Sequence, residues 1–309
     1  MLIFILRRVL QTIPSLLLMT LFVFIVLRVS GDPLMIMFGE SLDLMTPEQV
    51  QSLRAHMGLD QPIFIQYVLY LRDLIQGDFG RSILYQNQAA LPLVLQRLPA
   101  TLELGAAALV VGILVSLPTG IIAALRRNRW PDHLASLFAI LGQAMPNFWL
   151  GIMLILLVSV QFGWLPVSGR GGVQHVILPA IALGTSMAAL LMRLMRSSLL
   201  EVLHADYVRT ARAKGLHGTV VLIRHALRNA MIPYLTVLGL SIASLLSGSV
   251  VTEQVFAWPG MGLLLIRAID GRDMAIVQTI VIFSALTVIL GNLIVDLLYS
   301  VLDPRIRYE

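Results

Sequence analysis

Long apolar runs recur along the 309-residue chain, and each is close to or above the roughly 17–25 residues that a helix needs to cross a bilayer. Between the first two runs, residues 30–100 instead show apolar positions at three- and four-residue spacing among polar ones, which is typical of helices lying against a surface. This pattern predicts an all-α, polytopic membrane protein with a single transmembrane domain over residues 1–309. Spans are expected at about residues 9–29, 102–125, 135–160, 176–195, 230–252 and 274–301.

The amphipathic segment contains two predicted helices. Thr46 and Gln49 have the spacing of a capping box, with Pro at the first helical position between them, and Gly58 is expected to end this helix. Pro62 opens a second helix that ends at Gly77. Its apolar face predicts packing against the spans, and a lateral lid or a lipid-surface role is the alternative. That face consists of Ile63, Phe64, Tyr67, Val68, Leu71 and Leu74.

A polar island separates the fourth and fifth apolar runs. Good helix formers extend from Ala205 to Lys214, and Gly215 then supplies a helix stop. A second helical stretch runs from Val220 to Arg228. Two short helices joined at a glycine would form a rigid projection that suits a binding partner. Seven fixed positive charges lie in or beside the island: Arg193, Arg196, Arg209, Arg212, Lys214, Arg224 and Arg228.

The distribution of Arg and Lys predicts the orientation in the membrane. The two termini, the loop at residues 126–133 and the island hold fourteen of these residues, whereas the two short opposite loops hold three. Because cytoplasmic loops are enriched in Arg and Lys, both termini and the loop at residues 196–229 should be cytoplasmic, with residues 30–100 periplasmic. The basic residues thus follow topology, and no nucleic-acid partner is expected despite the net charge of +5.

Composition agrees with a membrane protein. The chain is 58% hydrophobic and 13% charged, whereas soluble domains contain about 25% charged residues. The absence of cysteine excludes a disulfide framework and a thiolate metal site.

Acidic residues inside the membrane would indicate an ion-coupled carrier, and two candidates occur. Glu103 lies at the outer end of the second span, where water reaches it. Asp296 lies near the inner end of the last span, where we expect it to cap or pair, with a role in proton transport as the alternative. Residues 142–147 interrupt the third span with Gly and Pro, which predicts either a packed kink or a break that lines a cavity.

Signatures of bond chemistry are missing from the sequence. It contains no Walker-type phosphate loop, no paired-histidine zinc motif and no nucleophile elbow, so we expect neither enzymatic activity nor a metal or cofactor in this chain. His225 is expected to be a packing or surface residue. A stand-alone secondary transporter or channel is the competing class, and it favours charged or broken spans in both halves. An intramembrane enzyme would need a convergent His, Asp and Ser set that is not visible.

Residues 206–216, followed by residues 225–230, resemble the loop that marks permease subunits of bacterial ABC importers, in the branch for dipeptides, oligopeptides and nickel. The general form of that loop is matched at Ala211, Gly215 and Leu227, and this branch carries Arg in place of the usual Glu. The chain is identified as a member of this family and as the first permease of a pair. Further similar stretches lie at residues 31–33, 77–82, 98–104, 258–262 and 303–307.

The resemblance implies the permease fold of a type I ABC importer in the bacterial inner membrane. The partners would be a second related permease, two cytoplasmic ATPases that hold ATP and Mg, and an extracytoplasmic substrate-binding protein. The substrate would be a di- or tripeptide, with longer peptides, glutathione or nickel as alternatives. Residues 201–233 would couple the chain to an ATPase, with Ala211 permitting close approach and Gly215 setting the angle between two helices. The coupling residues would be Asp206, Tyr207, Arg209, Thr210, Ala211, Arg212, Lys214, Gly215 and His225.

The loop after the fifth span combines an aromatic residue with turn formers. The resemblance places it at the periplasmic mouth, where it would touch the binding protein or shape the gate. Trp258 has an alternative interpretation as an interfacial membrane anchor. The residues concerned are Glu253, Trp258, Gly260 and Gly262.

Overall fold

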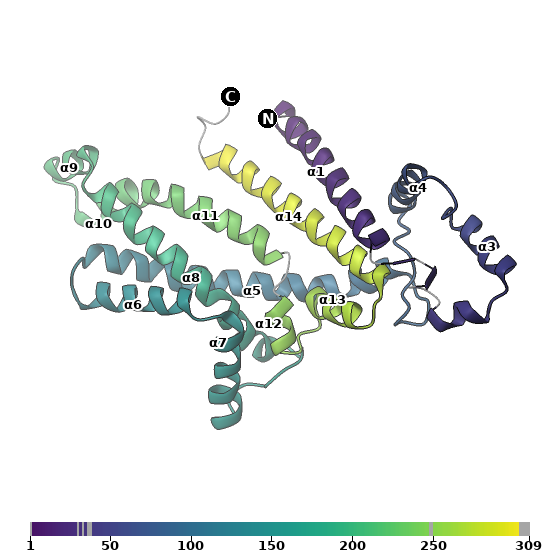
Figure 1. Ribbon diagram of the computed structural model, residues 1–309. Coiled ribbons are helices and arrows are strands. Elements are labelled where there is room, and N and C mark those ends of the chain that lie inside the picture. The colour runs from purple at the N-terminus through teal and green to yellow at the C-terminus, as the bar shows by residue number, and fades with distance from the viewer. Residues whose placement is uncertain (1, 30, 33, 36–38, 247–249, 303–309) are drawn as a thin grey trace. The chain divides into compact units, whose positions relative to one another are not determined.

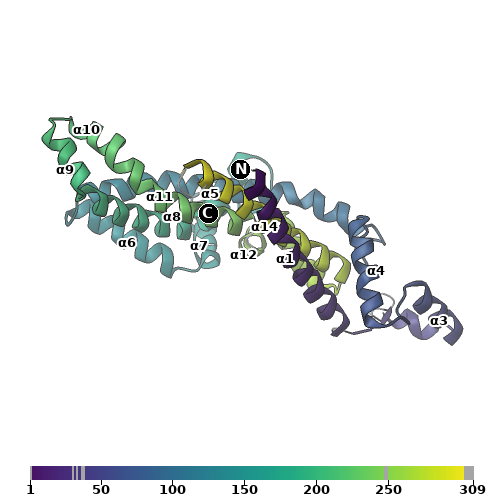
Figure 2. The same cartoon turned by 90° about the horizontal axis from the view of Figure 1, so that it is seen from above.

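The computed structural model describes residues 2–29, 31–32, 34–35, 39–246 and 250–302, and no strand occurs among these residues (Figure 1; Figure 2). The all-α prediction is therefore confirmed. The helices are α1 (Leu2–Val29), η1 (Gly39–Leu44), α3 (Pro47–His56), α4 (Ile63–Ile75), α5 (Ala90–Leu125), α6 (Trp130–Ala144), α7 (Asn147–Leu154), η2 (Ile155–Gln161), α8 (Val173–Leu203), α9 (Asp206–Ala213), α10 (Gly218–Val220), η3 (Val221–Leu227), α11 (Arg228–Leu246), α12 (Val250–Val255), α13 (Met261–Asp270) and α14 (Met274–Leu302).

The chain forms two compact units. Unit 1 contains the chain up to Pro99 together with Leu263–Thr287. Unit 2 contains Ala100–Gly262 and the chain from Val288 onward. Helices α5, α13 and α14 contribute residues to both units.

Among the described residues, four helices are long and apolar enough to cross a membrane. A fifth candidate combines α6 with α7 and η2, which meet at a bend of 105°. Predicted spans correspond to all five, although α5 begins at Ala90, before residue 102, and α8 continues to Leu203, beyond residue 195. For the remaining predicted span, α11 reaches Leu246, and residues 247–249 lie outside the described part. The four single-helix candidates are Leu10–Val29, Ala90–Leu125, Val173–Leu203 and Met274–Leu293.

The bend in the third predicted span has a local cause. α6 ends at Ala144, Met145 is extended with φ −81° and ψ 126°, and α7 begins after Pro146. Proline disfavours a helical conformation in the preceding residue and has no N–H to donate. Gly142 packs against α8, where a Cβ would lie 3.0 Å from the Cβ of Ala189. These contacts support the packed-kink interpretation.

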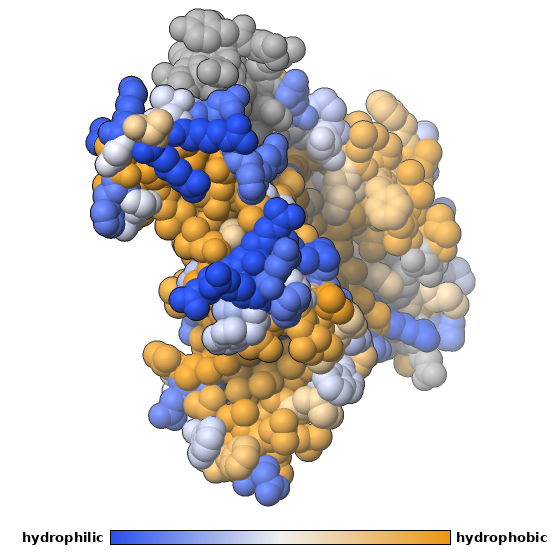
Figure 3. All heavy atoms as spheres, turned by 90° about the vertical axis from the view of Figure 1, so that its left-hand side faces the viewer, coloured by the Kyte–Doolittle hydropathy of each residue, from blue (hydrophilic) through white to orange (hydrophobic). Residues whose placement is uncertain are grey.

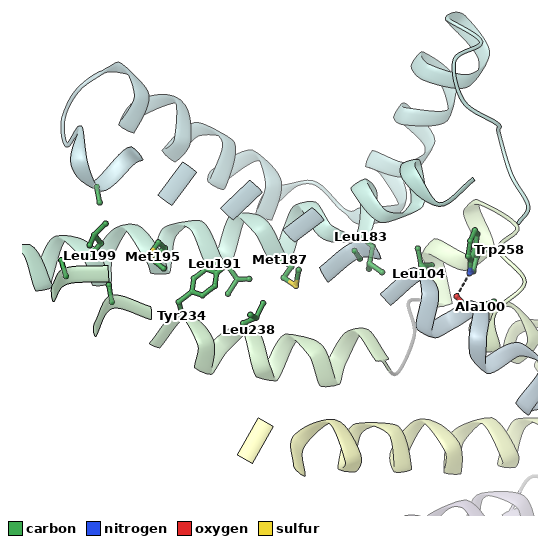
Figure 4. Close-up of a cluster of buried hydrophobic side chains, with 14 residues drawn as sticks. Ala100, Leu104, Leu183, Met187, Leu191, Met195, Leu199, Tyr234, Leu238 and Trp258 are labelled. Carbon is green, nitrogen blue, oxygen red and sulfur yellow. Dashed lines mark hydrogen bonds between the residues drawn. The ribbon is translucent and has the colours of Figure 1, made fainter. Parts of the chain in front are cut away.

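The core of unit 2 forms around α8, which meets α6, α7 and α11 and also packs closely on α5. Tyr234 of α11 is 1% exposed, and its hydroxyl lies 2.7 Å from that of Ser116 on α5, so this buried polar pair is satisfied. Because lipid tails are as apolar as leucine, such a core is held in a membrane mainly by van der Waals packing. Figure 4 shows part of this cluster, including Leu183, Met187, Leu191, Met195, Leu199, Tyr234 and Leu238.

Glycines allow α5 and α8 to approach closely. A Cβ on Gly184 would lie 2.7 Å from the carbonyl oxygen of Ala108, and one on Gly120 would lie 2.9 Å from that of Met192. Backbone atoms cannot swing away as a flexible side chain can. The contact between the two helices therefore depends on both glycines.

Both helices predicted for the amphipathic segment are present in unit 1. The Thr46 hydroxyl accepts a hydrogen bond from the backbone N–H of Gln49, whose side chain accepts one from the N–H of Thr46, so the capping box is confirmed. α4 begins directly after Pro62. Gly58 and Gly77 follow the ends of α3 and α4 with φ of +65° and +82°. Local sequence signals are sufficient to define both helices.

The apolar face of α4 packs against α1 only in part. The Tyr67 hydroxyl donates to the carbonyl oxygen of Leu17 at 3.0 Å, and the Tyr67 ring lies 5.4 Å from that of Phe24. Phe64, from the same predicted face, is 73% exposed. Packing is thus confirmed for Tyr67, whereas Phe64 is open to lipid or to a partner.

A buried carboxylate joins the turn after α4 to the start of α14. Asp273 is 0% exposed and accepts hydrogen bonds from the Ser82 hydroxyl and from the backbone N–H of Ile276, at 3.2 Å in the second case. Gln278 donates to the carbonyl oxygen of Phe79 at 2.6 Å. A buried charge is stable only with such partners. The sequence stretch that contains Phe79 and Ser82 therefore serves packing within unit 1.

Candidate functional site

The polar island forms a helical hairpin at one end of unit 2, and we call residues 206–229 the basic hairpin (Figure 1). Its first arm, α9, agrees with the helix predicted for residues 205–214. Gly215 follows with φ +77°, and its N–H donates to the carbonyl oxygen of Arg212 at 2.9 Å. A Cβ there would have nothing within 4 Å. The backbone conformation, and not a lack of space, requires glycine.

The second arm differs from the prediction of a short helix. α10 continues through η3, a π-helical turn, into α11. Val220 and Arg228 flank this turn and keep helical φ and ψ angles, so the helix does not break. Single turns of π-helix occur frequently at functional sites. The second arm is therefore continuous with α11.

The inner face of α9 is apolar and buried. Val208 is 0% exposed and Ala211 is 5% exposed, and both pack against Val221 of the second arm and Val202 of α8. The expectation that Ala211 permits close approach of an ATPase is wrong, because its methyl group faces inward. Ala211 instead allows the two arms of the hairpin to pack together.

The outer face of α9 is polar and exposed. Arg209 is 71% exposed, and its guanidinium lies 3.5 Å from the Asp206 carboxylate, which is 95% exposed. A surface pair of this length contributes little to stability. The Arg209 guanidinium is therefore available to a partner. Thr210, Arg212 and Lys214 are exposed on the same helix and its C-terminal end.

A hydrogen bond fastens the two arms at their base. The side-chain amide of Asn229 donates to the Tyr207 hydroxyl at 2.8 Å and to the carbonyl oxygen of His225 at 3.2 Å. Tyr207 is 43% exposed, and His225 is half-buried. Both residues therefore serve the shape of the hairpin. The packing or surface role predicted for His225 agrees with this position.

An ion pair links α8 to the first turn of α6. The Arg196 guanidinium donates to both carboxylate oxygens of Asp132, at 2.5 and 2.8 Å. Asp132 is buried and also accepts from the backbone N–H of Asn128 at 2.8 Å. Bidentate pairs of this kind fix orientation strongly. Sequence analysis missed Asp132, because its partner lies 64 residues away in the chain.

Positive charge gathers at this end of unit 2. Three arginines of the α5–α6 turn, Arg126, Arg127 and Arg129, are exposed, as are the basic residues of α9. Figure 3 shows these hydrophilic clusters over a surface that is otherwise largely hydrophobic. Two arginine-rich loops that are distant in sequence therefore share one end of the unit.

A cleft of about 450 Å³ opens beside the basic hairpin. Arg212 and His217 of the hairpin contribute to its lining, together with Leu125 at the end of α5 and Leu203 at the end of α8. The cleft thus combines a cationic side chain with an apolar floor, which suits an acidic or amphipathic element of a partner.

Glu253, one of the residues predicted for the periplasmic mouth, carries a buried carboxylate, and the other predicted residues lie close to it in the chain. Glu253 is 0% exposed and accepts from the Thr101 hydroxyl at 2.9 Å. Trp258 is also 0% exposed, and its indole N–H donates to the carbonyl oxygen of Ala100 at 2.8 Å (Figure 4). The interpretation of Trp258 as an interfacial anchor is therefore wrong. Neither side chain is accessible to a binding protein, which corrects the expected direct contact.

The two glycines of this loop are required by packing. A Cβ on Gly260 would lie 2.4 Å from the Glu253 carboxylate, and one on Gly262 would lie 2.7 Å from the Cα of Val250. Thr101 receives a hydrogen bond from the N–H of Met261 at 2.8 Å and so joins the loop to α5. Sequence analysis noted residues 98–104 but did not connect them with this loop.

Of the two acidic candidates, Glu103 and Asp296, the structure describes the side chain of Glu103 alone. Glu103 forms an ion pair with Arg170 at 2.5 Å, and both side chains are about two-fifths exposed, at 38% and 41%. Glu103 is therefore partly exposed and paired with a cation, and its access to water stays a prediction. The side chain of Asp296 lies outside the described residues.

Apolar helices with a hairpin that is packed on one face and cationic on the other define a membrane subunit that acts through a partner. Residues 116–308 match the model of the binding-protein-dependent transport system inner membrane component, and residues 1–105 match that of its N-terminal part. The chain belongs to this family, the permease components of ABC importers.

Curated relatives align over the whole chain. The chain is 42% identical over 310 residues to the glutathione transport system permease protein GsiC of Escherichia coli (strain K12), with 100% of both chains covered. The same values hold for GsiC of Salmonella paratyphi A.

Solved structures show the shared fold. A chain of the inward-facing MetNI methionine ABC transporter superposes with a TM-score of 0.58 at 17% identity, covering 68% of this chain and 96% of that one. A chain of an amino acid ABC transporter gives 0.52 at 18% identity, covering 67% and 92%.

Proposed function

We propose that this chain is one of two related permease subunits of an ABC importer for short peptides, with glutathione as the favoured substrate. It crosses the inner membrane six times, with both termini in the cytoplasm and residues 30–100 in the periplasm. Two cytoplasmic ATPase subunits bind ATP and Mg and supply the energy, and an extracytoplasmic binding protein delivers the substrate. This chain performs no bond chemistry and binds no cofactor of its own.

The two-faced construction of the basic hairpin carries this proposal. Its inner face is buried against unit 2, while Arg209 and Arg212 are exposed on its outer face. An acidic groove on an ATPase would complement this surface, because opposite charges guide and fix such interfaces.

Coupling follows from the continuity of the second arm. When ATP closes the ATPase pair, α9 moves with its groove, and Val208 and Ala211 transmit the displacement to Val221. The unbroken path from α10 into α11 then shifts a helix of the predicted fifth span. The permease would thereby alternate between inward and outward openings.

The shared position of the two arginine-rich loops supports the proposed topology. Because the chain contains no cysteine, a single cysteine introduced at Gly218 reports one site. Gly218→Cys should react with a membrane-impermeant maleimide only from the cytoplasmic side. Ser168→Cys, exposed in the loop before α8, should react only from the periplasmic side. Labelling of Gly218→Cys from outside would overturn the topology.

The substrate proposal rests on the 42% identity to the glutathione permeases over the whole chain. The test is uptake of labelled glutathione and of labelled dipeptides into proteoliposomes that contain the chain with the proposed partner subunits. We expect ATP-dependent uptake of glutathione that requires the binding protein. Uptake by this chain alone, without an ATPase, would instead identify a stand-alone carrier.

A further inference from the structure

A half-open cavity of about 250 Å³ lies in unit 1. Its walls come from the last turns of α1, from α4, from the turn after α4 and from the first turn of α14. Both α1 and α14 contain candidate membrane spans, so the cavity lies where these spans end, at the level of a bilayer boundary. Apolar residues form most of the lining, among them Phe24, Leu27, Ile83, Met274 and Ala275.

Two buried hydrogen-bond donors in this lining have no acceptor. The Nε of Arg28 and the hydroxyl of Tyr70 are buried and lack a hydrogen-bond partner among the described residues. Burial, and then the neighbouring Tyr67, raise the pKa of the Tyr70 hydroxyl, so it is protonated and can donate. Unpaired buried donors are costly and uncommon, which points to an acceptor supplied by another molecule.

The charges around the cavity favour an anion. Arg28 lies with its guanidinium 5.0 Å above the Phe24 ring, and Arg81 also lines the cavity, with its guanidinium donating to the carbonyl oxygen of Asn87 at 3.1 Å. Asp32 is the nearby acid, and its carboxylate is engaged by Arg54. Asp273, beside the lining residue Met274, is likewise engaged by the Ser82 hydroxyl and by the backbone N–H groups of Leu84 and Ile276, so neither carboxylate is paired with Arg28 alone.

We infer that this cavity binds a phospholipid, with an anionic phosphate oxygen at Arg28 and Tyr70 and part of an acyl chain along the apolar walls. Phospholipid is the occupant that the position indicates, because the cavity lies at the edge of the bilayer and requires both an apolar body and an acceptor head. Basic pockets between membrane helices bind lipid head groups on the cytoplasmic side of membranes, and this cavity offers the same chemistry at the opposite boundary. The lipid would fasten α1, α4 and α14 of unit 1 to one another.

The test is native mass spectrometry of the purified full chain during titration with dioleoyl phosphatidylglycerol. Wild-type chain should retain one tightly bound lipid. Arg28→Gln and Tyr70→Phe should each bind it roughly tenfold more weakly, since each removes a hydrogen bond to a charged group. Ala275→Leu should reduce binding by filling the cavity. Arg72→Gln is the matched control, because Arg72 lies on α4, is exposed and pairs with Asp73.

Circular dichroism and gel filtration establish that each variant is folded. If Arg28→Gln does not fold, Tyr70→Phe decides, because it removes a single oxygen and keeps the ring. Equal lipid retention by the wild type, Tyr70→Phe and Ala275→Leu would overturn the proposal. Displacement of the retained lipid by a soluble leucine-containing dipeptide would also overturn it, since the cavity would then be a peptide site.

Discussion

Replacing Gly215 by Val should uncouple ATP hydrolysis from transport. The φ of +77° lies in the left-handed region, where a residue with a Cβ costs roughly 1–2 kcal/mol and a β-branched residue is least tolerated. Since a Cβ there would have nothing within 4 Å, the cost comes from the backbone and not from a clash. A penalty of this size shifts populations roughly 5–30-fold. It would favour a different turn and change the angle between α9 and the second arm.

Gly218→Val is the matched control for this change. Gly218 also has nothing within 4 Å of a Cβ, but it begins α10 without a left-handed φ. Complexes of both variants are purified, the bound ATPase is quantified, and substrate-stimulated hydrolysis is measured beside uptake in proteoliposomes. We expect Gly215→Val to keep most of its ATPase and to lose uptake far more than hydrolysis, with Gly218→Val close to the wild type. Normal uptake by Gly215→Val at normal assembly, or equal losses in the two variants, would refute the reasoning.

Three further predictions concern other contacts. Arg209→Glu reverses an exposed charge of α9 and should weaken retention of the ATPase, with the difference from wild type shrinking as salt screens the interface; a salt-independent loss would count against an electrostatic contact. Gly260→Ala would place a Cβ 2.4 Å from the Glu253 carboxylate, and overpacking of about 1–3 kcal/mol should lower the temperature at which the detergent-solubilised chain aggregates; an unchanged temperature would show that the loop adapts. Asp132→Asn should destabilise the chain by about 1–3 kcal/mol, and combining it with Arg196→Gln should add less than the sum of the two changes; full additivity would mean that the pair does not act as a unit.

The first arm of the hairpin could be predicted from the sequence because its determinants are local. Good helix formers, basic residues in the last turn and a glycine in the left-handed region act within a few residues of one another. The capping box at Thr46 is another case, since both hydrogen bonds join residues three apart. Such elements need no knowledge of the rest of the fold.

The second arm could not be predicted as well, because periodicity alone does not say where a helix ends. The stretch from Val220 to Arg228 has helical spacing, and the apolar run that follows has it too. In the structure the helix continues through both to Leu246. A helix end needs a positive stop signal, and here Gly218 begins the second arm instead of following it.

Long-range contacts account for the errors at the candidate sites. The anchor interpretation of Trp258 rested on the general preference of tryptophan for membrane interfaces. In the structure its indole donates to a carbonyl oxygen 158 residues away and is buried. Asp132 is likewise one acid among many until its pairing with Arg196 is known. Ala211 faces inward because α9 packs on the second arm of the hairpin. The sequence alone does not indicate which face of a short helix is buried.

The central claim, that the outer face of α9 contacts an ATPase, can be tested by cross-linking in this cysteine-free chain. Thr210→Cys places a thiol on the exposed face of α9, and Ser168→Cys places one in the exposed loop before α8. Each variant is co-expressed with the partner subunits and treated with a short photoactivatable thiol reagent, and the cross-linked protein is identified by mass spectrometry. The account predicts a cross-link from Thr210→Cys to an ATPase subunit and none from Ser168→Cys. An assembled complex in which labelled Thr210→Cys yields no ATPase cross-link, or in which Ser168→Cys yields one equally, would contradict it.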